Sequence, residues 1–209
     1  LLEYKFANQI QKLTLNNRQN IAFSEGHGEL PFEKTFRLQQ ELQNFYNVGR
    51  LNLDSLIVID KALDLLIVAA PKEEFDDKTK FKLDQYIMNG GKVIWLLEKL
   101  TADLDSINKY RFYVPEDIVT NIDDLLFTYG ARIQPNLVLD LECSAIPQVV
   151  GQQDGQPQTM LYKWFYHPLA IANRDHPIGK NLDRINMFFP SSIDTLKTAT
   201  NIKKTPILT

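Results

Sequence analysis

Unbroken apolar runs that alternate with one-sided helical patterns limit the fold of this chain more than any other feature. Residues 65–70 and residues 93–97 contain no polar residue at all. A strand that helices cover on both faces has this composition, because neither face meets water. Between the two runs, Leu83, Tyr86 and Ile87 recur at the i, i+3, i+4 spacing of a helix with one apolar face. The alternation predicts a mostly parallel sheet with helices on both faces, a three-layer α/β core.

The same alternation extends on both sides of these runs. It predicts four further elements: a strand at residues 21–23, a helix at 32–46, a helix from about 120 to Gly130, and a strand at 137–140. Residues 51–53 and 56–59 are alternative positions for the second strand, and we favour 51–53. The predicted core therefore covers about residues 20–140.

Beyond residue 141 the pattern becomes that of antiparallel strands. Residues 148–150 and 160–166 flank a turn-rich segment that contains Asp154-Gly155, which predicts a β-hairpin. We expect residues 141–209 to form a β-rich extension packed on the same domain, so that residues 1–209 make a single α/β domain.

Charge and cysteine usage exclude several classes of function. The formal net charge is -3, and the basic residues form no strip with interleaved aromatics, so we expect no nucleic-acid partner. Cys143 is the only cysteine, which rules out an internal disulfide and suggests a small buried side chain. No apolar run reaches the roughly 20 residues that cross a bilayer. Because the chain begins without Met, we expect it to be a piece of a longer chain whose membrane anchors lie elsewhere.

The turn after the first strand is the place to look for chemistry, since ligands of parallel sheets bind beyond the carboxyl ends of strands. It carries Glu25, His27 and Glu29 between glycines. A carboxylate beside an imidazole suits acid–base catalysis or ligand binding, although these side chains could equally cap the next helix. Gly26-His27-Gly28 lacks the third glycine of a dinucleotide site, and no Gly-Lys-Ser/Thr follows, so neither NAD nor ATP is expected as a cofactor.

Two other groups of residues in the second half of the chain contain side chains of the kinds that form sites. His167 and His176 each precede a proline without a nearby cysteine or paired carboxylate, so we predict no metal site there. Tyr162, Trp164 and Tyr166 recur with period two and would share one face of a strand. Such a stripe can stack on a sugar or on a partner, while packing over a core is its commoner role.

Several stretches, taken in order, resemble a known family. They are residues 21–29, residues 65–71, residues 84–96 with Asn89-Gly90-Gly91, residues 129–140, and Asp175-His176-Pro177-Ile178. Together they resemble the GldG family of auxiliary ABC-transporter proteins, which is associated with gliding motility in Bacteroidetes. The resemblance covers about residues 20–195 and depends on order and spacing, since no single motif is diagnostic.

The resemblance implies a periplasmic domain held outside the cytoplasmic membrane by flanking segments, working with an ATPase and a permease subunit. Proteins of this kind are often described as substrate-binding. The resemblance also implies a flavodoxin-like or glutamine-amidotransferase-like fold without its chemistry, and Pro71-Lys72-Glu73-Glu74 indeed lacks the nucleophile elbow of such enzymes. We expect a non-enzymatic binding or interaction domain. The alternatives are a carbohydrate-binding module that uses Tyr162, Trp164 and Tyr166, and a hydrolase or amidotransferase-like enzyme that uses the Glu25 turn.

Overall fold

The computed structural model describes residues 2–14, 17–102, 104, 113–153, 155–198 and 200–209. The chain divides into two compact units. Unit 1 contains Leu1–Leu97 and Val119–Leu125, and unit 2 contains Glu98–Ile118 and Leu126–Thr209. That the two units make up one domain stays a prediction.

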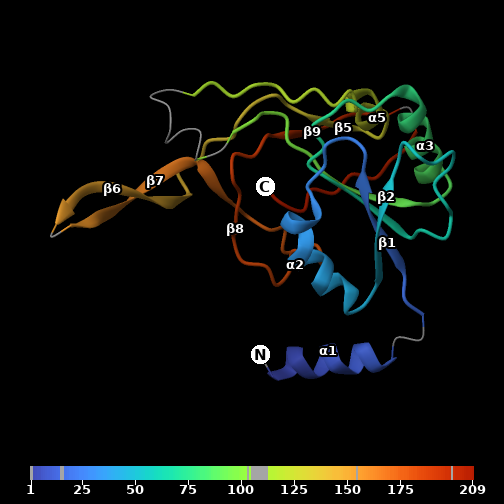
Figure 1. Cartoon of the computed structure of the whole chain (residues 1–209), viewed down its shortest axis with the longest axis horizontal. Helices are drawn as coiled ribbons and strands as arrows, with labels where there is room; N and C mark the ends of the chain where they lie inside the picture. Colours follow the sequence, from blue (N-terminus) through green and yellow to red (C-terminus); the bar gives the residue numbers. More distant parts are fainter. Residues whose placement is uncertain (1, 15–16, 103, 105–112, 154, 199) are drawn as a thin grey trace. The chain divides into compact units, whose positions relative to one another are not determined.

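Unit 1 is built on a four-stranded parallel sheet with the strand order β2-β1-β3-β4 (Figure 1). The strands are β1 (Asn20–Glu25), β2 (Asn47–Asn52), β3 (Leu65–Ala69) and β4 (Lys92–Leu96). The helix α2 (Phe32–Gln43) connects β1 to β2, and α3 (Asp77–Met88) connects β3 to β4. The prediction of an α/β fold with a mostly parallel sheet is therefore confirmed.

The two central strands, β1 and β3, are buried on both faces, as their apolar composition requires. One face carries Ile21, Phe23 and Ile67, which form a buried cluster against which Leu42 of α2 packs. The opposite face carries Leu66 and Val68, both fully buried. Residues of β2 and β4 alternate between exposed and half-buried for most of their length, as expected for strands at the two edges of the sheet.

The ends of α3 follow the predicted signals. The Asp76 side chain accepts a hydrogen bond of 2.7 Å from the backbone N–H of Thr79, so Asp76 is the N-cap. Hydrogen bonds from the Thr79 side chain and from this backbone N–H lower the pKa of Asp76 below its usual value, because both favour the carboxylate. After Met88 the chain leaves the helix through Gly90, whose φ of +95° suits glycine.

Two sequence predictions differ from the structure. Residues 137–140 form no strand, although Val138 donates one backbone hydrogen bond of 2.9 Å to the carbonyl of Pro190. Leu139 is 58% exposed, so this short apolar run is not a buried central strand, and its composition alone could not show that. The helix predicted at 32–46 ends at Gln43, because residues 44–46 turn the chain into β2. The second strand, β2, overlaps the favoured residues 51–53, and residues 56–59 lie in the loop after it.

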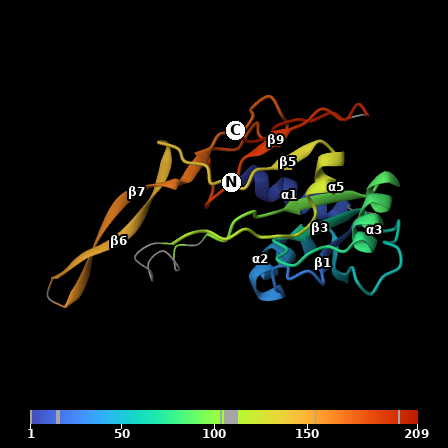
Figure 2. The same ribbon diagram turned by 90° about the horizontal axis from the view of Figure 1, so that it is seen from above.

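Unit 2 is antiparallel in its strand pairing. The strands β5 (Ala131–Ile133) and β9 (Ile193–Thr195) pair with each other, and a second sheet has the order β6-β7-β8 (Figure 2). Its strands are β6 (Cys143–Gln153), β7 (Gln156–Ala170) and β8 (Ile185–Asn186). The helix α5 (Asp123–Thr128) begins in unit 1 and ends in unit 2. His167 of β7 is buried against the ring edges of Phe188 and Phe189, and burial lowers the pKa of its imidazole.

The sequence analysis did not predict α1 (Leu2–Thr14) at the start of the chain. Its apolar side chains Leu2, Phe6, Ile10 and Leu13 are all more than half exposed, so little burial supports this helix. Lys12 connects it to the end of α2 through a hydrogen bond of 3.0 Å from its ammonium to the side-chain oxygen of Asn44. Within the described residues, neither α1 nor any other helix combines the length and the apolar character of a membrane span.

Candidate functional site

The best-defined candidate site lies at the carboxyl ends of β1, β2 and β3. From β1 the chain passes to β2 on one side, and β3 then pairs with the other side of β1. The strand order thus reverses at β1, and ligands of parallel sheets bind at such a switch point. Three turns meet here: residues 26–30 after β1, 53–55 after β2, and 70–73 after β3. We call this region the switch corner.

His27 is the central side chain of the switch corner and is only 3% exposed. Its ring stacks on the ring of Phe75, with 4.0 Å between centroids and 6° between planes. Its backbone carbonyl accepts hydrogen bonds of 2.9 and 3.0 Å from the N–H groups of Lys72 and Glu73. The residue therefore connects the turn after β1 to the turn after β3.

The two glutamates predicted beside His27 serve different partners. The Glu29 carboxylate accepts a hydrogen bond of 2.7 Å from the backbone N–H of His27, which closes the turn on itself. The Glu25 carboxylate pairs with the guanidinium of Arg50 on the neighbouring strand β2. Arg50 also donates a 3.1 Å hydrogen bond to the Leu30 carbonyl. Within the described residues, Glu29 thus holds a backbone N–H and Glu25 holds the Arg50 cation, and neither carboxylate pairs with the imidazole.

The imidazole instead lies beside Asp54, a residue that the sequence analysis missed. The His27 Nε2 is 3.5 Å from Oδ1 of Asp54, whose side chain is 56% exposed. Asp54 is oriented by its own backbone N–H, which donates a 2.9 Å hydrogen bond to the Asn52 side chain. The available signal was the Asn52-x-Asp54 pattern, since Asx turns of this kind commonly end strands.

Three polar atoms of the switch corner are buried and have no hydrogen-bond partner among the described residues. They are the Ser24 hydroxyl, Nδ1 of His27 and Oε1 of Glu29. Nearly all buried polar groups in folded proteins have partners, so three in one corner are unusual. Gly26 and Gly28 bracket the imidazole with φ of +120° and +69°, and a Cβ on Gly26 would lie 2.8 Å from Asp54 Oδ2. The conformation therefore favours glycine at position 26, and a side chain there would also displace the Asp54 carboxylate.

An open groove of about 760 Å³ adjoins the switch corner at Asp54. The loop after β2 forms one side with Leu56 and Ile57, and the first turns of α3 form the other with Phe81. Ile57 is 91% exposed and Phe81 is 64% exposed. Lys82 holds the two sides together, because its ammonium donates hydrogen bonds to the carbonyls of Leu53 and Leu56. The volume lies in the range of about 300–1,000 Å³ that is usual for small-molecule sites.

Most charged groups of the groove already have partners. Asp76 caps α3, and Asp77 pairs with Lys80 at 3.2 Å. Lys78 has no ion-pair partner within the described part of the chain, and Asp54 contacts only the buried His27 among ionisable groups. The groove therefore offers apolar side chains, one free cation and one carboxylate, a combination that suits an amphiphilic ligand.

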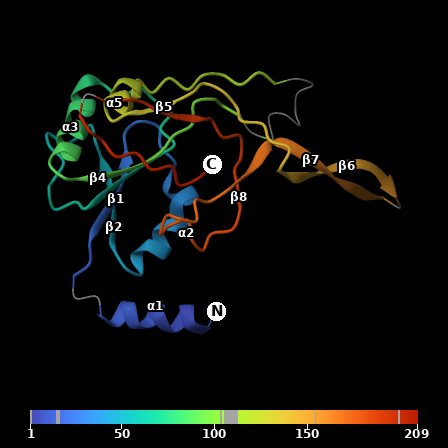
Figure 3. The ribbon, with the colours of Figure 1, turned by 180° about the vertical axis from the view of Figure 1, so that it is seen from behind.

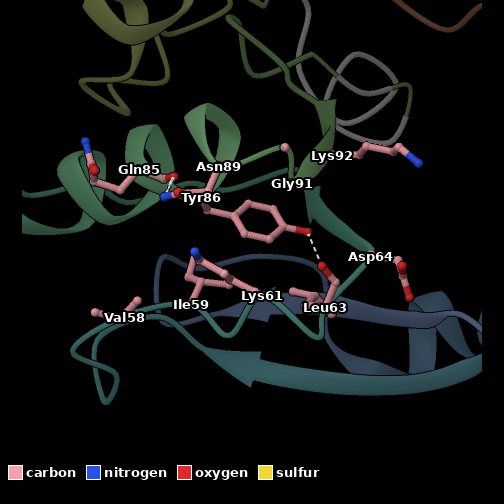
Figure 4. Close-up of a pocket in the computed structure, with 11 residues that line it drawn as sticks. Val58, Ile59, Lys61, Leu63, Asp64, Gln85, Tyr86, Asn89, Gly91 and Lys92 are labelled. Atoms are coloured by element: carbon pink, nitrogen blue, oxygen red, sulfur yellow. Dashed lines mark hydrogen bonds between the residues drawn. The ribbon is translucent and has the colours of Figure 1, made fainter.

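A second, smaller pocket lies at the opposite, amino edge of the sheet (Figure 4). The ring of Tyr86 crosses it, and the Tyr86 hydroxyl donates a 3.0 Å hydrogen bond to the Leu63 carbonyl. Burial raises the pKa of this phenol. At about 150 Å³ the pocket falls below the usual range for ligands, and it lies at the wrong edge of a parallel sheet, so the groove is the better candidate.

The aromatic stripe of β7 does not form one flat platform. Tyr162 is 43% exposed, while Trp164 and Tyr166 are half-buried. The rings of Trp164 and Tyr166 are inclined by 49° at a centroid distance of 5.8 Å, and Tyr166 packs on Phe189 at 6.2 Å. Two of the three rings therefore pack within unit 2.

His176 accepts a 3.3 Å hydrogen bond from the Ile178 N–H in a tight turn. The described residues contain no cluster of three or more side chains suited to a metal ion.

The family of this chain follows from its match to a known family model. The model described as "ABC-type uncharacterized transport system" matches residues 18–209. The chain belongs to that family. It is accordingly an auxiliary component of an ABC-type transport system. No curated protein matches the chain significantly.

The fold has a counterpart among solved structures. The structure described as "mmIFT52 N-terminal domain" aligns with a TM-score of 0.56, covering 90% of this chain and 72% of that one. The two sequences are 19% identical, so this likeness concerns the fold alone. It extends over both units, as does the match to the transport family.

Proposed function

We propose that this domain is a non-enzymatic binding and interaction domain of its ABC transport system, with the groove beside the switch corner as its ligand site. The observation that carries the proposal is the state of the candidate catalytic residues. Glu25 is paired with Arg50, Glu29 is bound to a backbone N–H, and the His27 ring is buried against Phe75. A general base must reach the proton that it abstracts. The buried His27 ring, stacked on Phe75, is better placed for a structural role.

The groove supports a ligand of mixed character. Its apolar side chains Ile57 and Phe81 would cover the apolar part of a small molecule, and Lys78 or Asp54 would meet a polar group at its end. Exposed apolar residues gathered beside a switch point are typical of a binding surface. In the adjoining switch corner, His27 Nδ1 and the Ser24 hydroxyl have no partner among the described residues and would be able to form hydrogen bonds with a polar group of the ligand.

We further propose that the domain works on the periplasmic side of the membrane, held there by segments outside this sequence, with the permease and ATPase subunits as partners. Membership of the transport family supports such partners. The order of motifs that resembles GldG supports an association with gliding motility.

A thermal-shift screen on the full-length protein tests the ligand site. Compounds that raise the melting temperature are retested on Phe81→Asp and on Met88→Asp, a matched control on the same helix at 71% exposure. We expect the shift to vanish in Phe81→Asp and to persist in Met88→Asp. Persistence of the shift in Phe81→Asp would rule out the groove, and turnover of a ligand that stops in His27→Phe would favour the enzyme alternative.

A further inference from the structure

The ribbon formed by β6 and β7 continues far beyond the rest of its sheet. We call residues 145–153 of β6 and 156–163 of β7 the arm. The only other strand that this sheet has in the described part of the chain, β8, pairs with β7 at Leu169 and Ala170, which lie outside the arm. Figures 2 and 3 show the arm from two directions with no described helix or strand of unit 2 beside it. A two-stranded ribbon on its own is at best marginally stable in water, so the arm needs another role or another surface.

Apolar side chains are exposed on both faces of the arm. Directly paired residues share a face, and the register pairs Pro147 with Leu161 and Gln148 with Met160. One face therefore carries Val149 and Leu161, which are 66% and 73% exposed. The other carries Met160 and Tyr162, which are 54% and 43% exposed, whereas Ile146, which pairs with Tyr162 on that face at the base of the arm, is buried. Exposed apolar groups on both faces mark a contact surface rather than the outside of a core.

The arm is almost free of charge. Lys163, at the base of the arm, is its only charged residue, and in the sequence Asp154 lies between its two strands. Natural proteins usually protect an open strand edge with charges, prolines or bulges. Here Pro147 and a register shift near Val149 interrupt β6, whereas β7 contains no proline between Pro157 and Pro168. The edge of β7 over residues 159–162, which precedes Lys163 and pairs with no strand but β6 among the described residues, is thus open to a further strand.

The size of the arm decides between possible occupants. With about 3.3 Å per residue and about 5 Å between strands, the eight residue pairs of the arm give one face of roughly 260 Å². A stable interface needs about 800 Å² on each partner, so one face is too small for two copies that lie flat on each other. Both faces and the open edge together reach the required area, which calls for a partner that encloses the arm.

A lipid surface fits less well, because the apolar residues lie in the middle of the arm. Its described end has no apolar side chain beyond Pro157, since Gly151, Gln152 and Gln156 lie there. A membrane would receive the tip first. An enclosing protein cleft would instead bury the middle and leave the polar tip in water.

We propose that the arm is a docking element, enclosed by an uncharged, apolar cleft of a partner subunit of the transport system, which adds a strand to the open edge of β7. This inference rests on the proposed function, since it takes its partner from that transport system. Backbone pairing along β7 would supply affinity, and Leu161 and Met160 on opposite faces would supply specificity.

The test measures binding of the full-length protein to the permease–ATPase complex in lipid nanodiscs. Leu161→Asp and Met160→Asp each place a charge in the proposed cleft, from opposite faces, and Ile178→Asp is the control at 60% exposure in unit 2. We expect each arm variant to weaken binding at least tenfold and the control to leave it unchanged, with equal melting temperatures. Leu161→Ser and Met160→Ser replace any variant that does not fold.

Each other outcome overturns the proposal in a distinguishable way. Binding that neither arm variant weakens removes the docking role and leaves the proposed function standing. Binding that only one face affects removes the enclosing cleft. Equal binding to empty nanodiscs identifies a lipid surface, and a dimer in sedimentation that Leu161→Asp dissolves identifies a second copy as the occupant. Absence of any wild-type binding to the complex removes the proposed partners and, with them, this inference.

Discussion

His27 offers the clearest test of whether the switch corner has a structural or a catalytic role. Substitutions can remove its nitrogen atoms while keeping an aromatic ring, or can remove the ring as well. His27→Phe keeps an aromatic ring against Phe75 and removes both nitrogens. Nδ1 is buried without a partner among the described residues, so its removal costs nothing in hydrogen bonding. The contact of Nε2 with the half-exposed Asp54 carboxylate is worth about 0–1 kcal/mol. We therefore expect His27→Phe to stay within about 1 kcal/mol of the wild type.

His27→Ala removes the ring as well. It leaves a cavity against Phe75, which is fully buried, and abolishes a stack of 4.0 Å. Loss of a buried ring of this size, including its stacking, costs about 2–4 kcal/mol. For a unit of this size, that lowers the melting temperature by about 8–16 °C.

The two tryptophans make the assay specific for unit 1. Trp95 lies in β4 of unit 1 and Trp164 in β7 of unit 2, so a Trp164→Phe background leaves Trp95 as the reporter. Urea unfolding followed by Trp95 fluorescence then gives the free energy of unfolding of each variant. Equal destabilisation by His27→Phe and His27→Ala would mean that the nitrogens, and not the ring, stabilise the switch corner, contrary to this prediction.

Three further predictions concern other groups. Asp76→Ala removes the N-cap of α3 and should lower the free energy of unfolding of unit 1 by about 1 kcal/mol in the same urea assay, whereas Asp76→Ser should retain most of it. The hydrogen bond from Lys80 lowers the pKa of Asp124, so the carboxylate stabilises the fold at pH values above the usual carboxyl pKa. This contribution is lost as the pH falls through the folded-state pKa of Asp124. Asp124→Asn should therefore weaken the dependence of the unfolding free energy on pH in the acid range. Burial lowers the pKa of His167, so the unfolded chain binds its proton first and stability should fall as the pH drops below about 6.5. His167→Phe should remove that dependence, and an unchanged pH profile from Trp164 fluorescence would contradict it.

The sequence predicted the elements in which local and tertiary signals agree. The buried strand β3 reads as an unbroken apolar run, and the cap at Asp76 and the exit at Gly90 bound α3 as expected. The switch corner could be located for the same reason, because its place depends on the order of strands and not on any particular side chain.

The features that were not predicted depend on tertiary contacts, which the local sequence pattern does not contain. Residues 137–140 have a strand's composition but lie where no strand pairs with them. Asp54 is brought to His27 by the parallel register of β1 and β2, which pairs Glu25 with Asn52, and spacing along the chain cannot show that. The helix α1 has few buried residues, so no core pattern marked it.

Hydrogen–deuterium exchange of the full-length protein, with and without a ligand from the thermal-shift screen, tests the central claim most directly. Because the groove is lined by the loop after β2 and the first turns of α3, we predict protection of residues 53–58 and 76–82 when the ligand binds, with the ligand recovered intact. Protection confined to the pocket around Tyr86, or chemical conversion of the ligand, would contradict the account.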